Sequence, residues 1–270
     1  MTAPTLVSPV TPPMAQSNGD GIVAAARPSW VETRRLLRQR STAALALGAI
    51  GLIILGLLGF ARENDRLLAA GTLTLGRATE RMLSQGFAAL LFATLAGALC
   101  VTAEFRHSTI GRSVFLFGGR GRLLMAKIGA SIITGVLLGA LGALASVVAT
   151  LVWLDRGGRP MVWTGDAVLT VAGVVIVSAL AGPLGVAIGW AVRNQTCAVV
   201  GILVWILGVE SAFVSLVPSV GKWLPGGAQA AVYRDPTSKH LGMSAGLALL
   251  VAWTVTITYA AFHFRRRDDL

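Results

Sequence analysis

Residues 128–154 read IGASIITGVLLGALGALASVVATLVWL and contain no charged side chain. A helix of about 20 apolar residues is long enough to cross the roughly 30 Å hydrocarbon core of a bilayer. The run does not alternate between apolar and polar residues, as a strand of a membrane barrel would. It therefore predicts a membrane-spanning helix.

Five further runs have the same character. In chain order, the six predicted spans are residues 42–60, 86–102, 128–154, 167–191, 197–217 and 243–264. The chain is 54% hydrophobic and its mean hydropathy is +0.72, well above the values of a soluble domain. Because an isolated polypeptide segment satisfies its backbone hydrogen bonds in lipid only as a helix, we predict an all-α membrane protein with six transmembrane helices.

Arginine and lysine are unevenly distributed between the two sides of these spans. The N-terminal segment, the second loop, the fourth loop and the C-terminal tail together carry more of them than the opposite loops do. The positive-inside rule therefore predicts that both termini face the cytoplasm and that residues 61–85, 155–166 and 218–242 face outward.

The formal net charge of +11 is divided among segments that flank the membrane. We therefore expect anionic lipid, and not nucleic acid, to be the partner of these charges. The preference for arginine over lysine is typical of a GC-rich bacterial genome. We expect the chain to be a multi-pass protein of a bacterial plasma membrane.

The N-terminal region divides into two parts. Residues 1–28 are rich in Pro, Ser, Thr, Ala and Gly and are predicted to form a disordered cytoplasmic tail, without the charged and apolar regions of a signal peptide. Residues 29–41 are predicted to form an amphipathic interfacial helix, in which Ser29 and Glu32 have the spacing of a capping box. The alternative is that residues 29–41 only begin the first span.

Two outer segments are too long for tight turns. Residues 61–85 contain leucines at helical spacing. Residues 218–241 are consistent with a short re-entrant or surface helix, or equally with an ordered loop.

Glycines recur at small-xxx-small spacing on two of the spans. Gly135 and Gly139 form one such pair, and Gly185 and Gly189 form the other. This spacing allows the backbones of neighbouring helices to approach closely. We expect both pairs to pack inside one bundle.

The segment between the second and third spans, residues 102–127, reads TAEFRHSTIGRSVFLFGGRGRLLMAK. It begins with the acid Glu104 and carries five basic residues around the short apolar core 114–117. Residues 103–127 must lie at a membrane face, because spans flank them on both sides. A basic loop with an apolar core is more typical of a docking surface than of a simple connection.

The motifs of soluble enzymes are absent from the sequence. The glycine-rich residues 118–121 lack the spacing of a phosphate-binding loop, so the chain is not expected to bind ATP itself. The three histidines are dispersed, and no cysteine pair has metal-ligand spacing. Cys100 and Cys197 are predicted near the reducing cytoplasmic side and are not expected to form a disulfide. We predict no catalytic residue, cofactor or metal.

Glu210 is a lone acid within the fifth predicted span. A carboxylate at the centre of a membrane helix costs about 2.5–3.5 kcal/mol on insertion scales, and therefore faces protein or a water-filled cavity. Glu210 is thus a candidate for a substrate cavity or a proton route. It is equally compatible with a hydrogen bond between helices, and we favour this structural role.

The six spans and the motif Thr102-Ala-Glu-Phe-Arg-His-Ser-Thr-Ile, followed by Arg120-Gly-Arg and then Lys127, resemble the ABC-2 type permeases. The resemblance extends from about residue 29 to the end of the chain and includes the element Leu224-Pro225-Gly226 and the basic cluster 265–267. The sequence departs from the family at Ser108, where glycine is frequent. It also departs at Gly118-Gly119, which replace a proline.

The resemblance implies a function and a site. It implies a transmembrane permease subunit that works with a separate ATPase and a second permease, identical or paralogous, to export a hydrophobic or amphipathic substrate. ATP and Mg²⁺ would be bound by the ATPase. The residues that inherit the ATPase-coupling role are Glu104, Phe105, Arg106, Thr109 and Ile110, supported by Arg112, Arg120 and Arg122. A stand-alone secondary transporter or channel, and a regulatory membrane subunit, are the alternatives.

Overall fold

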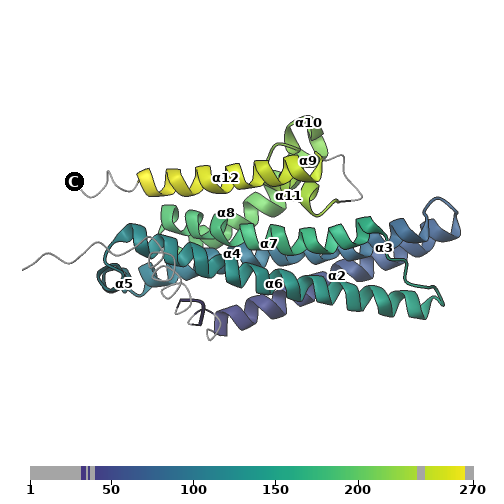
Figure 1. Ribbon diagram of the computed structural model, residues 1–270, viewed down its shortest axis with the longest axis horizontal. Helices are drawn as coiled ribbons and strands as arrows, with labels where there is room; N and C mark the ends of the chain where they lie inside the picture. Colours follow the sequence, from purple (N-terminus) through teal and green to yellow (C-terminus); the bar gives the residue numbers. More distant parts are fainter. Residues whose placement is uncertain (1–31, 35, 37–39, 236–240, 265–270) are drawn as a thin grey trace, which may run out of the picture.

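The computed structural model describes residues 32–34, 36, 40–235 and 241–264 (Figure 1). This part of the chain is 86% helical and contains no strand. It includes six helical stretches long and apolar enough to cross a membrane: Ser41–Ala69, Leu75–Arg106, Arg120–Arg156, Gly165–Val192, Gln195–Leu216 and Met243–His263. The predicted six-span, all-α architecture is confirmed at this level. The predicted tail 1–28 lies outside the described residues.

The helices follow one another with short connections. In chain order they are α2 (Arg40–Ala69), α3 (Leu75–Ser84), the 3-10 turn η1 (Gln85–Ala88), α4 (Ala89–Arg106), α5 (Ile110–Leu116), α6 (Arg120–Arg156), α7 (Gly165–Val192), α8 (Gln195–Leu203), the π-helical η2 (Val204–Glu210), α9 (Ser211–Leu216), α10 (Pro218–Gly221), α11 (Pro225–Val232) and α12 (Met243–Phe264). Of residues 29–41, those that the structure describes are helical.

The spans agree with hydropathy in position and differ from it in length. α12 has the bounds predicted for the sixth span. α6 begins at Arg120, well before the predicted residue 128, because the helix continues through a charged stretch in which Arg120 and Arg122 are exposed and Lys127 is buried. α2 continues to Ala69, and α3 occupies most of the remaining outer segment, so the helical spacing predicted for residues 61–85 is confirmed.

The fifth predicted span is helical but not a continuous α-helix. α8 gives way to the π-helical η2, and α9 completes the span. Single π-helical turns are rare and frequently lie at functional sites. In the segment that follows, which was predicted to face outward, helices are found in place of the alternative loop. One of them, α11, buries Ala228, Ala231 and Val232 in the core.

α7 is the centre of the bundle and packs against both α4 and α6 (Figure 1). A Cβ atom added at Gly185 would collide with the carbonyl oxygen of Thr94 on α4, and one added at Gly135 would collide with that of Ser178 on α7. Only glycine permits such close backbone contact. Packing of the glycine pairs inside one bundle is therefore confirmed.

The bundle has two ends, which we call the α5 end and the α3 end. α5 and the last turns of α12 lie together at the α5 end, and α3 lies at the opposite end (Figure 1). Between the ends, large apolar side chains face outward, among them Leu47, Leu144 and Val255, each more than half exposed. Such a surface is suited to contact with lipid tails.

Candidate functional site

The segment between the second and third spans, in which the family resemblance implies a coupling helix, is mainly helical and lies at the α5 end. α4 extends to Arg106, α5 forms after the turn 107–109, and α6 starts after the turn 117–119. Ser108 has a φ of 53°, and the N–H of Thr109 donates a hydrogen bond of 2.9 Å to the carbonyl oxygen of Glu104. Gly118 and Gly119 have φ values of 69° and 139°, which proline cannot adopt. These tight turns hold α5 across the end of the bundle.

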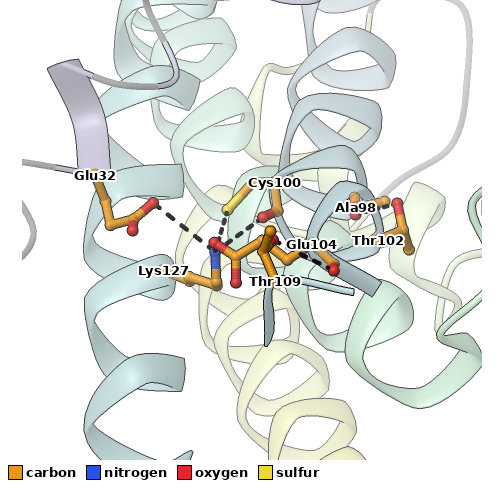
Figure 2. Close-up of polar contacts among 7 residues, drawn as sticks. All are labelled: Glu32, Ala98, Cys100, Thr102, Glu104, Thr109 and Lys127. Atoms are coloured by element: carbon orange, nitrogen blue, oxygen red, sulfur yellow. Dashed lines mark hydrogen bonds and ion pairs between the residues drawn. The ribbon is translucent and has the colours of Figure 1, made fainter. Parts of the chain in front are cut away.

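Lys127 is fully buried and joins three segments (Figure 2). Its Nζ lies 2.9 Å from Oε1 of Glu104 and 3.8 Å from Oε2 of Glu32. The same Nζ donates a hydrogen bond of 2.9 Å to the carbonyl oxygen of Cys100. Glu104 and Glu32 are 3% and 4% exposed. We call these four residues the Lys127 cluster.

The Lys127 cluster fixes the relative position of its segments. Removing each charge from water costs several kcal/mol, so a buried ion persists only where partners with good geometry surround it. Lys127 has two carboxylates and one carbonyl oxygen as partners. The Lys127 cluster therefore holds together the end of α4, the start of α6 and the helical residues 32–34.

An apolar layer lies beside this cluster. Phe105 packs edge-on against Trp190 of α7, with ring centroids 6.4 Å apart. The guanidinium of Arg193 lies over the ring of Phe105, 5.5 Å from its centroid. Ile110 packs against the buried cluster that includes Leu123. A groove of about 540 Å³ runs between α5, α7 and α12 and includes these aromatic rings in its lining.

The predicted coupling residues therefore have different environments. Glu104 is buried in the Lys127 cluster, and Phe105, Thr109 and Ile110 are partly buried. The four exposed ones are Arg106, Arg112, Arg120 and Arg122.

The outer side of α5 also carries two apolar side chains. Phe115 is 85% exposed and Leu116 is 69% exposed. We call Arg106, Arg112, Phe115 and Leu116 the α5 surface. Arg106 donates a hydrogen bond of 3.4 Å to Oε1 of Gln195, which holds one edge of this surface against α8.

Glu210 lies on η2 and is 5% exposed. Its Oε1 accepts a hydrogen bond from the backbone N–H of Gly226, in the first turn of α11. A Cβ atom on Gly226 would lie 2.7 Å from the carboxyl carbon, so only glycine allows this approach. The structural hydrogen bond that we favoured for Glu210 is present. A cavity of about 250 Å³ adjoins the same carboxylate.

Tyr233 follows α11 and stacks on Phe87, with ring centroids 5.2 Å apart. Burial raises the pKa of the Tyr233 phenol above its usual value, and the carboxylates of Asp235 and Glu210 act in the same direction. The phenol is therefore neutral at physiological pH.

The sequence alone does not show the partners of the predicted residues. In the sequence Lys127 is one of five basic residues between two spans, whereas in the structure it is the buried partner of Glu104. The position of Lys127 in the sequence could have indicated this pairing. Two antiparallel helices joined by a short connection place residues of equal depth side by side. No local pattern identifies Glu32 or Trp190, because each reaches the site through the tertiary fold.

The described residues include no group of three or more His, Cys, Asp or Glu side chains placed to hold a metal ion. Cys100 is a buried thiol and Cys197 an exposed one. The arrangement at the α5 end is suited to binding and to transmitting movement between helices. No protein-family model matches the chain, and no curated protein sequence matches it significantly.

Proposed function

We propose that this chain is the transmembrane permease subunit of an ABC-2 type transporter. In this proposal a separate ATPase docks at the α5 end, which faces the cytoplasm of a bacterial cell, and a second permease copy or a paralogue completes the transporter. The exported substrate is hydrophobic or amphipathic. The six apolar helices support the transmembrane part of this assignment.

The observation that carries the proposal is an exposed helix on a rigid base. α5 presents Arg112, Phe115 and Leu116 outward. Aromatic and arginine side chains are the types that most often dominate the binding energy of a protein interface. Beneath them, the Lys127 cluster joins α4 to α6. A partner that moves α5 would therefore move two spans together.

The backbone at Ser108 supports the family resemblance independently. Ser108 stands where the resembled family frequently has glycine, and its φ of 53° lies in the left-handed region that glycine adopts without strain. The turn at Gly118 and Gly119 differs from the family pattern, because its positive φ values exclude the proline found there.

The proposed mechanism is transmission through packed helices. Closure of the ATPase on nucleotide would displace α5. The displacement would pass through the Lys127 cluster to α4 and α6, and from both to α7, whose backbone contacts them at Gly185 and Gly135. Closely packed helices move as bodies and do not deform continuously, so the push would open the bundle toward the other face.

Site-specific photocrosslinking in the native host tests the docking surface. We place p-benzoylphenylalanine at Phe115 and, as a matched control, at Leu144, which is 61% exposed on the middle of α6. We expect the probe at position 115 alone to crosslink to a protein with ABC ATPase motifs. If neither position, or both, captures such an ATPase, the proposed docking surface is wrong.

Reconstitution with the captured ATPase then tests coupling. Arg112→Glu and Phe115→Ala should uncouple ATP hydrolysis from transport in liposomes. Arg66→Glu and Arg156→Glu, exposed at the α3 end, should leave coupling intact. Transport that proceeds without any ATPase would favour the secondary transporter instead.

A further inference from the structure

A cavity of about 250 Å³ lies between α4, α7, the η2 region, α11 and α12. Its walls are mainly aliphatic, with Trp205 as the aromatic member, and its three polar side chains are Thr94, Glu210 and Gln229. The volume is slightly below the range of about 300–1,000 Å³ that is usual for drug-sized ligands. The cavity therefore has the size and lining for a small amphiphile.

The one ionisable side chain among the described residues that line this cavity is the acid Glu210. Glu210 has one hydrogen bond among the described residues, from the N–H of Gly226 to Oε1. No arginine, lysine or histidine is among the described residues that line the cavity. A carboxylate in an apolar site is costly unless a cation compensates its charge. The structural hydrogen bond thus explains the position of one oxygen of Glu210. Among the described residues, the cavity wall contains no cation that would compensate an ionised Glu210.

Two further features suit a ligand at this position. Glu210 ends the π-helical η2, and π-helical turns frequently lie at functional sites. Trp205, on the same turn, presents an aromatic ring to the cavity, and the face of an indole attracts a cation within about 6 Å of its centroid. A negative group, an aromatic ring and aliphatic walls together select a ligand that is both positive and apolar.

We propose that this cavity binds a small hydrophobic cation, a protonated amine or a quaternary ammonium, whose positive group pairs with Glu210. The apolar part of the ligand contacts the aliphatic walls, and Gln229 accepts a hydrogen bond where the cation carries a proton. The identification of this cation as the exported substrate rests on the proposed function. The binding of the cation to the cavity is independent of that function.

Equilibrium binding of radiolabelled benzyltrimethylammonium tests the site. The purified chain is placed in nanodiscs of zwitterionic phosphatidylcholine, without any ATPase, so that anionic lipid does not attract the probe. We expect saturable binding of one cation per chain. Unlabelled benzyltrimethylammonium should displace it, whereas neopentylbenzene, the uncharged molecule of the same shape, should not.

Two variants locate the probe. Glu210→Gln retains an oxygen that accepts the Gly226 hydrogen bond, and it should weaken binding about 10- to 100-fold, the loss expected for a charge-assisted contact. Glu63→Gln, which removes an exposed acid at the α3 end, should leave binding unchanged. Equal affinity in wild type and Glu210→Gln would overturn the proposal, as would the absence of saturable binding.

A second measurement covers the case in which Glu210→Gln does not fold. In the wild-type chain, benzyltrimethylammonium should slow the modification of Glu210 by dicyclohexylcarbodiimide, followed by mass spectrometry. Unchanged modification would contradict the site. The binding assay contains no ATPase, so its result does not depend on the proposed transport function. If the chain binds the cation but no ATPase drives its transport, the proposed transport function is refuted and the cation site remains.

Discussion

Replacement of Lys127 by methionine tests the role of the Lys127 cluster most directly. Methionine keeps an unbranched side chain of similar length and removes the charge. The substitution leaves the carboxylates of Glu104 and Glu32, 3% and 4% exposed, without their shared cation. We expect a strong loss of stability, because removing one partner of a buried ion pair is among the most destabilising changes in a protein.

The magnitude follows from the distances. At an effective dielectric constant of about 20, unit charges 2.9 Å apart attract by about 6 kcal/mol and those 3.8 Å apart by about 4 kcal/mol. Desolvation of the three ions offsets much of this attraction, so the sum is not the stability of the cluster. Breaking a buried pair from one side typically costs about 3–5 kcal/mol, and we expect Lys127→Met to lower the free energy of unfolding by this amount.

The assay is reversible unfolding in mixed micelles of increasing SDS fraction, followed by tryptophan fluorescence. Arg122→Met is the matched control, because Arg122 is exposed and lies on the same helix. Its effect should stay within about 0.5 kcal/mol. The double variant of Glu104→Gln and Lys127→Met should lose less unfolding free energy than the two single variants lose together. We expect the difference to be about 0.5–3 kcal/mol. Equal stability of Lys127→Met and Arg122→Met would refute the reasoning.

Four further predictions follow from other parts of the molecule. Gly185→Leu should prevent assembly of a monodisperse bundle, because the added side chain meets α4, whereas Gly51→Leu has open space and should behave as wild type in size-exclusion chromatography. Ser108→Gly should raise the melting temperature or leave it unchanged, because it relieves a positive φ; a clear decrease would contradict the turn described here. Burial raises the pKa of Tyr233, so the stability that its neutral phenol contributes is present below pH about 10 and is lost as the pH rises further. Tyr233→Phe should therefore reduce the fall in melting temperature at alkaline pH. An equal fall in the variant and the wild type would argue against this role of Tyr233. A cysteine at Arg112, on a background without the native cysteines, should react with an impermeant maleimide only after the cells are permeabilised; labelling of intact cells would reverse the proposed orientation.

Hydropathy predicted the spans because burial in lipid depends on the composition of each segment and not on its neighbours. The sixth span agrees at both ends with α12. The start of α6 was placed too late, at residue 128, because a hydropathy window ends where charge begins, whereas the helix continues to Arg120. The π-helical η2 was not predicted, since no local sequence signal marks its change of register.

The coupling site stays a prediction, and the sequence showed only part of its geometry. The motif around Glu104 precedes the short helix α5, whose one arginine, Arg112, is exposed. The assignment of Glu104 to a docking surface did not anticipate its burial, because a charge near a helix end is usually solvated. Its pairing with Lys127 depends on how α4 and α6 are set side by side, which no window along one chain segment describes. Its predicted coupling role would act through Lys127.

The order of the three charges along the chain has a consequence for biosynthesis. Glu32 and Glu104 leave the ribosome before Lys127 does. While the first two spans enter the bilayer, neither acid yet has Lys127 as a partner. The contacts of Glu32 and Glu104 with Lys127 form only after the start of the third span has been made. A nascent chain arrested before Lys127 is therefore expected to hold its N-terminal segment less tightly than the finished protein does, and protease should cleave this segment faster.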